Sequence, residues 1–207
     1  MSTGLYTADD GRIRCWWCEG HDDYQAYHDD EWGRPVADDQ RLFEKICLEG
    51  FQAGLSWLTI LRKRDAFRRA FHDFDYHQVA NFGTRQVNRL LKNAGIIRHR
   101  GKIDATINNA RRAVEMEKEC GSLAAFFWQY EPKNRRAALK NQADACLHST
   151  SEEAKALSKT LRIRGWKFVG PTTAYAFMQS MGMVNDHLKK CSCHEAVEDL
   201  RSSFERP

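Results

Sequence analysis

Residues 164–182 read RGWKFVGPTTAYAFMQSMG and combine the end of one helix with the start of another. The first helix ends at Gly165, a short apolar hairpin covers residues 166–169, and Gly170-Pro171 begins the second helix, where proline loses no helical hydrogen bond. The free amides at the start of the second helix form an anion site beside Lys167. This pattern suits a DNA phosphate, and it equally fits an ordinary turn between two helices.

Helical patterns continue on both sides of this hairpin. Ser151 begins the helix that ends at Gly165, and a longer helix runs from about Lys102 to Cys120. The other expected helices begin at Asp38 or Asp39, at Ser56, at Thr84 and at Ser122. These signals predict helices along most of the chain.

The segments between these helices offer no clear strand. No stretch shows the sustained alternation of apolar and polar residues that a half-buried strand requires, so we predict an all-α fold. The helix that begins at Ser56 carries apolar residues as far as Phe71 and is expected to be one element. Residues 131–150 are polar and weakly patterned, and we interpret them as the main linker.

The composition is that of a globular protein. Of the 207 residues, 42% are hydrophobic, which is enough to bury a core. The apolar stretches are too short to span a bilayer, and the first residues lack the basic and apolar regions of a signal peptide. We therefore expect a cytoplasmic protein with no membrane contact.

The net charge of +4 is modest, but the charges are unevenly distributed. Residues 1–34 are acidic, whereas basic clusters recur through the middle of the chain, at residues 62–64, 68–69, 98–102, 111–112 and 162–167. Most clusters of this kind are solvated helix faces. Several of them beside helix-ending glycines nevertheless keep a polyanion such as nucleic acid among the expected partners.

The cysteines favour metal binding over disulfides. Their number is seven, which is odd, and the protein is expected to stay in a reducing compartment. In VNDHLKKCSCH, residues 184–194, His187 and Cys191 share one face if the segment is helical, so they could bind one metal ion together. A tetrahedral structural site needs two more donors. The run Cys15-Trp-Trp-Cys18 also suits a redox pair, but the βαβ context of such pairs is missing.

Six blocks of sequence follow one another in order. They are RCWW (14–17), YQAYHDDEWG (24–33), LFEKICLEGFQAGLSW (42–57), NAGIIRHRGKI (93–103), GWKFVGPTTAYAFMQ (165–179) and VNDHLKKC (184–191). Together they resemble the DNA-3-methyladenine glycosylase I family, bacterial base-excision repair enzymes of the helix-hairpin-helix class. The similarity covers roughly residues 12–194, and six ordered blocks are far more specific than one motif.

The resemblance implies one glycosylase domain over residues 1–207, built from two helical lobes and acting as a monomer. One lobe would contain residues of about 12–37 and 150–194, with the helix-hairpin-helix module at 151–181. The second lobe would cover about 38–130, and residues 195–207 would form a tail.

The resemblance also implies the missing metal donors. In this family one structural zinc ion ties the chain termini together, and its ligands correspond here to Cys15, His28, His187 and Cys191. Two cysteines and two histidines close the coordination sphere, which is typical of structural zinc. Other donors stand nearby and leave ligand exchange within each cluster open, namely Cys18, His21, Cys193 and His194.

The implied activity is hydrolytic removal of 3-methyladenine from alkylated double-stranded DNA, which leaves an abasic site. Glu49 would be the carboxylate that hydrogen-bonds the base and supports catalysis, while the base would lie among the rings of Tyr27, Trp57, Trp17 and Trp32. A cationic purine calls for such aromatic faces and a carboxylate. Glu49 follows an apolar helix face eight residues before Trp57, so a half-buried carboxylate beside an aromatic wall is plausible from the sequence alone.

The resemblance extends to the DNA contacts. Leu55 would wedge into the gap that the flipped base leaves, and Lys167 and Gly170 would hold a phosphate at the hairpin. Asp186 stands near the usual catalytic aspartate of other helix-hairpin-helix enzymes, but its neighbours suggest that it helps to build the zinc end. Trp16 and Phe51 depart from the family pattern, and we expect them to alter the pocket rim or to pack together.

Two rival functions come from other classes. A non-catalytic, zinc-containing helix-hairpin-helix protein that only binds DNA would need no purine pocket, so Glu49, Tyr27 and Trp57 together argue against it. A zinc hydrolase would need an open position on the metal, and four protein ligands leave none.

Overall fold

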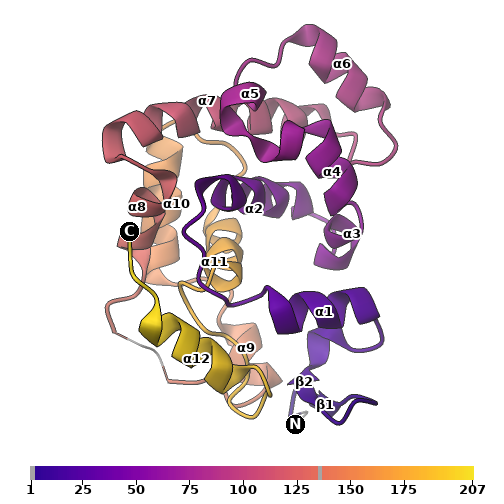
Figure 1. The fold of residues 1–207 in the computed structure, drawn as a ribbon, viewed down its shortest axis with the longest axis vertical. Coiled ribbons are helices and arrows are strands. Elements are labelled where there is room, and N and C mark those ends of the chain that lie inside the picture. Colours follow the sequence, from indigo (N-terminus) through magenta and orange to yellow (C-terminus); the bar gives the residue numbers. More distant parts are fainter. Residues whose placement is uncertain (1–2, 135–136) are drawn as a thin grey trace.

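The computed structural model describes residues 3–134 and 137–207, and it confirms the all-α prediction (Figure 1). A small antiparallel hairpin, β1 (Leu5–Thr7) and β2 (Ile13–Cys15), was not predicted. Each strand has three residues, which is too short for alternation to be recognised. Within the described part of the chain, every helix is too short or too polar to cross a membrane.

Helix α2 (Asp39–Gln52) is the central element (Figure 1). It begins as predicted, because the Asp38 side chain accepts a hydrogen bond from the Arg41 amide at 2.8 Å. Helices α7 (Arg100–Cys120), α8 (Leu123–Phe127) and α11 (Pro171–Ser180) pack around α2. This packing buries polar residues of α2 together with its apolar face.

The helix expected from Ser56 to Phe71 is two helices, α3 (Trp57–Leu61) and α4 (Arg64–Ala70). Ser56 caps α3 as predicted, and a turn at residues 62–63 separates the two helices. The break turns α4 so that Phe67 packs on Phe51, with ring centroids 4.5 Å apart. The short elements η2 (His72–Phe74), α5 (Tyr76–Val79) and α6 (Thr84–Lys92) follow.

The helix-hairpin-helix module consists of α10 (Glu152–Ile163), the hairpin at residues 164–170, and α11. Ser151 caps α10 as expected, and Gly165 has a φ of +81° that glycine adopts readily. The Asn109 side chain of α7 holds the hairpin by accepting from the Lys167 amide at 2.8 Å and donating to the Lys167 carbonyl at 2.9 Å. The hairpin is therefore fixed to the helices around α2.

The predicted linker at 131–150 contains a helix, α9 (Gln142–Leu147), capped by Asn141. This helix has no buried residues, so its sequence carries no apolar stripe that would reveal it. Leu139 just before it is 3% exposed and packs with Leu188. Residues 135–136 of the expected linker lie outside the described residues.

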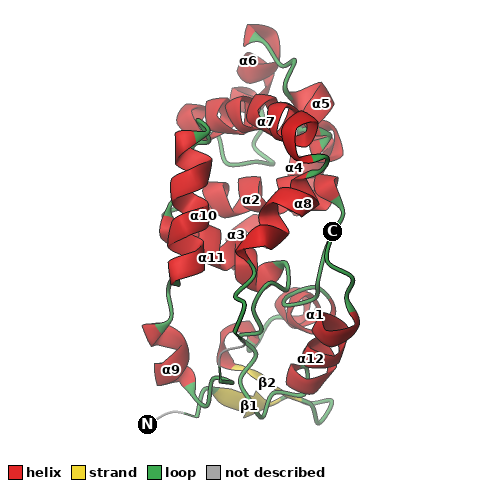
Figure 2. Cartoon of the chain, turned by 90° about the vertical axis from the view of Figure 1, so that its left-hand side faces the viewer, coloured by secondary structure: helices red, strands yellow, loops and turns green. Residues whose placement is uncertain are grey.

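Segments near the two ends of the chain share the lower part of the molecule, as Figure 2 shows for β1, β2, α1 (Asp22–Asp30) and α12 (His194–Ser203). The Ser192 amide donates to the Ile13 carbonyl at 2.8 Å. The expected tail at 195–207 instead contains most of α12, in which Val197 and Arg201 are buried. The segment from residue 184 to 193, for which helical geometry was only considered as a condition for a shared His187–Cys191 face, is a loop.

The remaining short elements are η1 (Trp16–Cys18) and η3 (Trp128–Tyr130). The Trp128 ring of η3 packs on Phe204 at 4.5 Å, which fastens the end of the chain to the helices beside α2. The two-lobe division of residues 12–194 stays a prediction, and α11 of one expected lobe packs directly on α2 of the other.

Candidate active site and metal centre

A cavity of about 260 Å³ lies where α1, α2, α3 and α11 approach one another. All five residues expected to bind a base line it, namely Trp17, Tyr27, Trp32, Glu49 and Trp57. The remaining lining residues were not predicted as base contacts: Trp16, Tyr24, Gln52, Leu139, Ala145, Cys146, Ala176, Gln179 and Asp186.

The aromatic side chains form a continuous wall. The Trp17 ring lies 4.9 Å from Tyr24 and 5.0 Å from Trp32, and the Tyr27 ring lies 5.4 Å from Trp57. Tyr24 and Tyr27 are three residues apart on α1, so they share one helix face. That spacing in YQAY was the signal that could have identified Tyr24.

Glu49 is one of two buried carboxylates that line this cavity, the other being Asp186. Glu49 is 5% exposed, and burial raises its pKa, whereas Lys45 acts in the opposite direction. The Lys45 Nζ lies 3.0 Å from the Glu49 Oε1, one helical turn away on α2. A carboxylate in such a place stays ionised only with a cation beside it.

Lys45 is the functional candidate that the sequence analysis missed. Its Nζ donates to the Tyr27 hydroxyl at 2.7 Å and lies 3.2 Å from the centroid of the Trp57 ring. Burial lowers the pKa of Lys45 to about 8, although Glu49 acts against this shift. The available signal was its position four residues before Glu49 inside the apolar run LFEKICLEG.

Trp16 and Phe51, the two departures from the family pattern, lie in different places: one at the cavity and one in the core. Trp16 lines the cavity, as expected for a residue at the rim. Phe51 is 1% exposed and packs in the core against Phe67 and Phe71 of the α4 region, so the expectation that it packs with Trp16 or alters the rim is wrong.

Asp186 lines the cavity but is held by α11. Its Oδ2 accepts from the Tyr175 hydroxyl at 2.8 Å and from the Gln179 side chain at 2.7 Å. It directly precedes His187, so it connects the cavity to the end of the chain where the cysteine and histidine donors gather.

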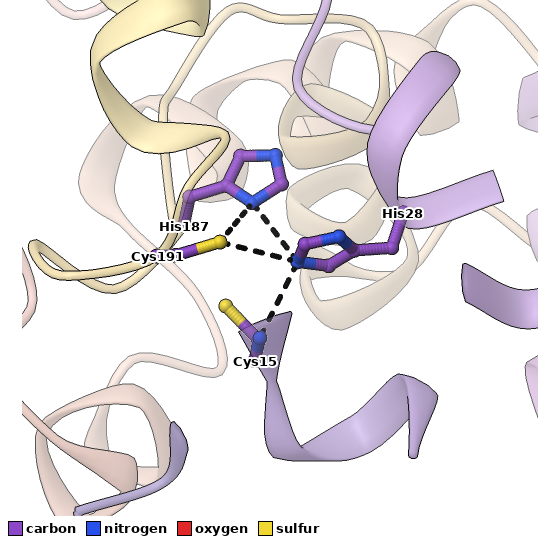
Figure 3. Close-up of side chains that lie close together, drawn as sticks. All are labelled: Cys15, His28, His187 and Cys191. Atoms are coloured by element: carbon purple, nitrogen blue, oxygen red, sulfur yellow. Dashed lines mark hydrogen bonds between the residues drawn. The ribbon is translucent and has the colours of Figure 1, made fainter. Parts of the chain in front are cut away.

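Four buried donors gather beside this cavity: Cys15, His28, His187 and Cys191 (Figure 3). Their ligand atoms all lie within 4.8 Å of one another. They come from β2, from α1 and from the loop before α12, so the structure brings the two ends of the chain to one point. The loop turns tightly where the Cys191 amide donates to the Leu188 carbonyl at 2.7 Å, so a turn, and not a helix, brings His187 and Cys191 together.

In each histidine of this cluster, the ring nitrogen that points away from the other donors has a hydrogen-bond partner, which fixes the orientation of the ring. The His28 Nδ1 lies 2.8 Å from the Asp29 carboxylate, which also accepts from Arg14 at 2.7 Å. The His187 Nε2 lies 3.1 Å from the Trp32 carbonyl oxygen. Such partners fix the ring orientation and leave the opposite nitrogen for a metal ion.

The four alternative donors occupy other positions. Cys18 donates to the Cys15 carbonyl at 3.2 Å, and the His194 Nδ1 lies 2.9 Å from the His187 carbonyl. His21 is exposed before α1. Cys193 forms a second buried group with His28 and Asp29, at 3.9 Å from the His28 Nδ1.

The expected DNA-contacting residues lie on exposed turns. Leu55 is 41% exposed in the turn after α2, and the buried Lys102 holds this turn by donating to the Phe51 and Ala53 carbonyls at 2.8 and 2.6 Å. Lys167 is exposed in the hairpin, and a Cβ added at Gly170 would meet open space.

Part of the basic character is compensated within the protein. Arg62 pairs with Asp23, Arg64 with Glu31 and Arg68 with Glu44. Two of these acids belong to the acidic segment 1–34. The basic clusters at 62–64 and 68–69 are therefore weaker evidence for a polyanion partner than the sequence suggested.

Comparisons with known proteins all find methyladenine glycosylases. The sequence model of the methyladenine glycosylase family matches residues 17–194. The chain is 47% identical over 182 residues to a DNA-3-methyladenine glycosylase of Haemophilus influenzae, covering 87% of this chain and 97% of that protein.

Solved structures of such glycosylases resemble the fold over most of this chain. A crystal structure of 3-methyladenine DNA glycosylase I has a TM-score of 0.83 at 47% identity, covering 87% of this chain and 99% of that chain. A variant of 3-methyladenine DNA glycosylase I in complex with 3-methyladenine has a TM-score of 0.81 at 34% identity, covering 86% of this chain and 95% of that chain.

Proposed function

Because the chain belongs to the methyladenine glycosylase family, we propose that its aromatic cavity receives 3-methyladenine that has been flipped out of alkylated DNA. The protein is a DNA-repair glycosylase that hydrolyses the N-glycosidic bond of this base and leaves an abasic site. The observation that carries the proposal is the meeting of the buried Glu49 carboxylate with several aromatic rings in a single cavity.

The aromatic wall would hold the flipped base by stacking. Extrusion costs a few kcal/mol of lost stacking and pairing, and each base–aromatic stack returns about 1–3 kcal/mol. Trp57 and Tyr27 stand on one side of the cavity, and Trp17 and Trp32 stand near the metal cluster. Rings from separate elements can therefore enclose a planar purine.

Glu49 would recognise the charge of the base. In DNA, 3-methyladenine is cationic, so its glycosidic bond is already weakened and the base leaves without prior protonation. A carboxylate that hydrogen-bonds this base gains a charge-assisted bond, which is stronger than a bond to a neutral base. Selection between the damaged and normal base would therefore depend on Glu49.

We assign a structural zinc ion to the four-donor cluster. In a tetrahedral zinc site, two nitrogens lie about 3.3 Å apart and a nitrogen and a sulfur about 3.6 Å apart. The His28 Nε2 lies 3.2 Å from the His187 Nδ1, and the Cys191 Sγ lies 3.5 and 3.6 Å from these nitrogens. With four protein donors the ion would crosslink the chain ends and leave no position for a catalytic water.

The hairpin and the turn after α2 would contact DNA. Lys167 and the amides that begin α11 suit a phosphate, and Leu55 would fill the gap in the base stack. These contacts carry no sequence information, in keeping with an enzyme that searches for damage at any sequence.

Release of free base from methylated duplex DNA tests this function. We expect the protein to release 3-methyladenine from that duplex and nothing from an undamaged one. The Trp57→Ala variant should release it more slowly, because stacking is lost, while Leu200→Ala on α12 removes a partly exposed side chain and should match the unaltered protein.

The results of this experiment distinguish the proposed glycosylase from the rival function. A protein that binds duplex DNA but releases no base would be a DNA-binding helix-hairpin-helix protein without catalysis. Release that Trp57→Ala leaves unchanged would mean that the base is held elsewhere.

A further inference from the structure

A single ammonium group contacts three residues of the base cavity. The Lys45 Nζ lies 3.0 Å from the Glu49 carboxylate, 2.7 Å from the Tyr27 hydroxyl and 3.2 Å from the centroid of the Trp57 ring. These three residues come from α2, α1 and α3, so Lys45 is the point at which three elements of the site meet.

Burial of the Lys45 ammonium group costs free energy that its contacts must offset. Lys45 is 6% exposed in the middle of the central helix, and burying an ammonium is strongly unfavourable unless charge and hydrogen bonds compensate it. Here the carboxylate, the hydroxyl and the ring face supply this compensation together. Lys45 and Glu49 are thus a mutually neutralised pair on one face of α2.

Two other cations around Lys45 are each paired with a carboxylate. Arg64 faces Lys45 from α4, but it binds Glu31, and Arg68 of α4 binds Glu44 of α2. The second carboxylate of the base cavity, Asp186, accepts hydrogen bonds from Tyr175 and Gln179 of α11. Arg41 of α2 lines the small cavity behind Lys45, and Tyr24 of α1 faces Glu49 from the base cavity. Lys45 is the cation that contacts Glu49 directly.

We propose that Lys45 is a positioning residue that keeps Glu49 ionised for the cationic base and orients the Tyr27 hydroxyl at the same time. The inference rests on the proposed function, because it assigns Lys45 a role within that base site. Lys45 also limits the negative charge of the cavity before the base arrives, so empty protein does not hold an isolated buried anion.

The direction of the pH effect follows from the pair. Only ionised Glu49 attracts the cationic base strongly. Burial favours the neutral carboxyl and Lys45 favours the ionised one, so removal of the lysine charge must raise the pKa of Glu49. The acidic limb of the activity profile then moves to higher pH.

The test compares single-turnover release of 3-methyladenine from methylated duplex DNA between pH 5 and pH 9. Lys45→Met keeps the length of the side chain without its charge, and Lys45→Arg keeps the charge. We expect the acidic limb of Lys45→Met to move upward by at least about one pH unit, equivalent to a tenfold loss near the limb, and that of Lys45→Arg to stay close to the unaltered protein. An unchanged limb in folded Lys45→Met would overturn the inference.

A second measurement does not depend on the variant folding. Carbon-13 NMR titration of glutamate carboxyls in the unaltered protein, with Glu49→Gln to identify the signal, should find Glu49 ionised at pH 7. A neutral Glu49 at that pH would contradict the role of Lys45. If the unaltered protein releases no base at all, the proposed function fails, while this titration still decides the state of the pair.

Discussion

At the scale of single residues, the site depends on how a carboxylate is kept charged inside a protein. Glu49 is buried because α2 is covered on nearly all sides, and its charge persists because Lys45 is buried with it. Burial of α2 therefore makes the Glu49 charge unfavourable and also places Lys45 beside it, where the opposite charge compensates.

Selectivity for the damaged base should be measurable at Glu49. Glu49→Gln keeps the shape of the side chain and loses its charge, so a charge-assisted hydrogen bond of about 1.5–3 kcal/mol becomes a neutral one. The neutral bond is about 1–1.5 kcal/mol weaker, so we expect roughly five- to tenfold weaker binding of 3-methyladenine, a smaller preference over adenine, and some remaining excision because the leaving group is already activated.

Calorimetric titration of each free base into both proteins measures the binding. Single-turnover release from methylated duplex DNA measures selection of the cationic base, because the base loses its positive charge when the glycosidic bond breaks. Glu44→Gln is the matched control, because Glu44 lies on the same helix and pairs with Arg68. Equal affinities in Glu49→Gln and the unaltered protein would place recognition of the base at another residue.

The sequence reveals residue roles unequally. Glu49, Tyr27, Trp17, Trp32 and Trp57 were predicted through family motifs, and the structure lines one cavity with them. Lys45 was missed because a lysine within a helix is usually solvated, and only the contacts of α1 and α3 with this face of α2 bury it.

At the scale of elements, the hairpin between α10 and α11 is the segment proposed to contact the DNA backbone, and the helices around it hold it in place. Its backbone is fixed by Asn109 of α7, and Ser158 of α10 donates to the Val169 carbonyl at 2.6 Å. The hairpin is thus pre-organised, and binding DNA does not require it to become ordered.

A branched side chain at Gly170 should weaken DNA binding without disturbing the fold. Gly170 has a φ of −64° and open space around an added Cβ, so Gly170→Val should fold normally yet obstruct a phosphate at the start of α11. We expect equal losses of affinity for damaged and undamaged duplexes, because phosphate contacts do not read the base.

Fluorescence anisotropy with both duplexes at moderate salt provides the measurement, and titration of free 3-methyladenine provides the control. The free base should bind Gly170→Val as it binds the unaltered protein. Full DNA affinity in this variant would show that the hairpin does not contact phosphate.

Helix starts were predictable, and helix continuity was not. Asp38, Ser56, Ser122 and Ser151 cap helices as expected, because their side chains meet amides only three residues away. The turn at residues 62–63, the exposed helix α9 and the buried helix α12 depend on contacts between distant segments. Local patterns carry little information about such contacts.

At the scale of the whole molecule, the donor cluster joins segments from opposite ends of the sequence. His28 and His187 are separated by 159 positions, yet their ring nitrogens lie 3.2 Å apart. A metal ion at this point would restrain both β1–β2 and the loop before α12, and with them Trp17 and Trp32, which pack on these histidines.

Loss of the metal should destabilise the protein and loosen both ends. We expect one zinc per chain in freshly purified protein and less in Cys191→Ser, whose melting temperature should fall by about 2–4 °C for each kcal/mol of stability lost. Cys120→Ser, which alters a half-buried thiol on α7, should keep both the zinc and the melting temperature.

Metal analysis together with thermal unfolding measures this, and hydrogen exchange should locate the loosened segments at residues 5–30 and 184–203. Freshly prepared protein without zinc would remove the basis for the assignment. Equal melting temperatures with and without chelator would mean that the ion, if bound, does not crosslink the ends.

The distance in sequence between the two halves of the donor cluster also sets an order of events during synthesis. Ribosomes add about 5–20 residues per second, so the 159 positions between His28 and His187 take about 8–30 s to translate. During this interval the nascent chain exposes Cys15 and His28 without their partners, and the helices around α2 can fold before the ends are joined. The donor cluster can therefore close only after Cys191 has been added, when the helices around α2 have already been synthesised.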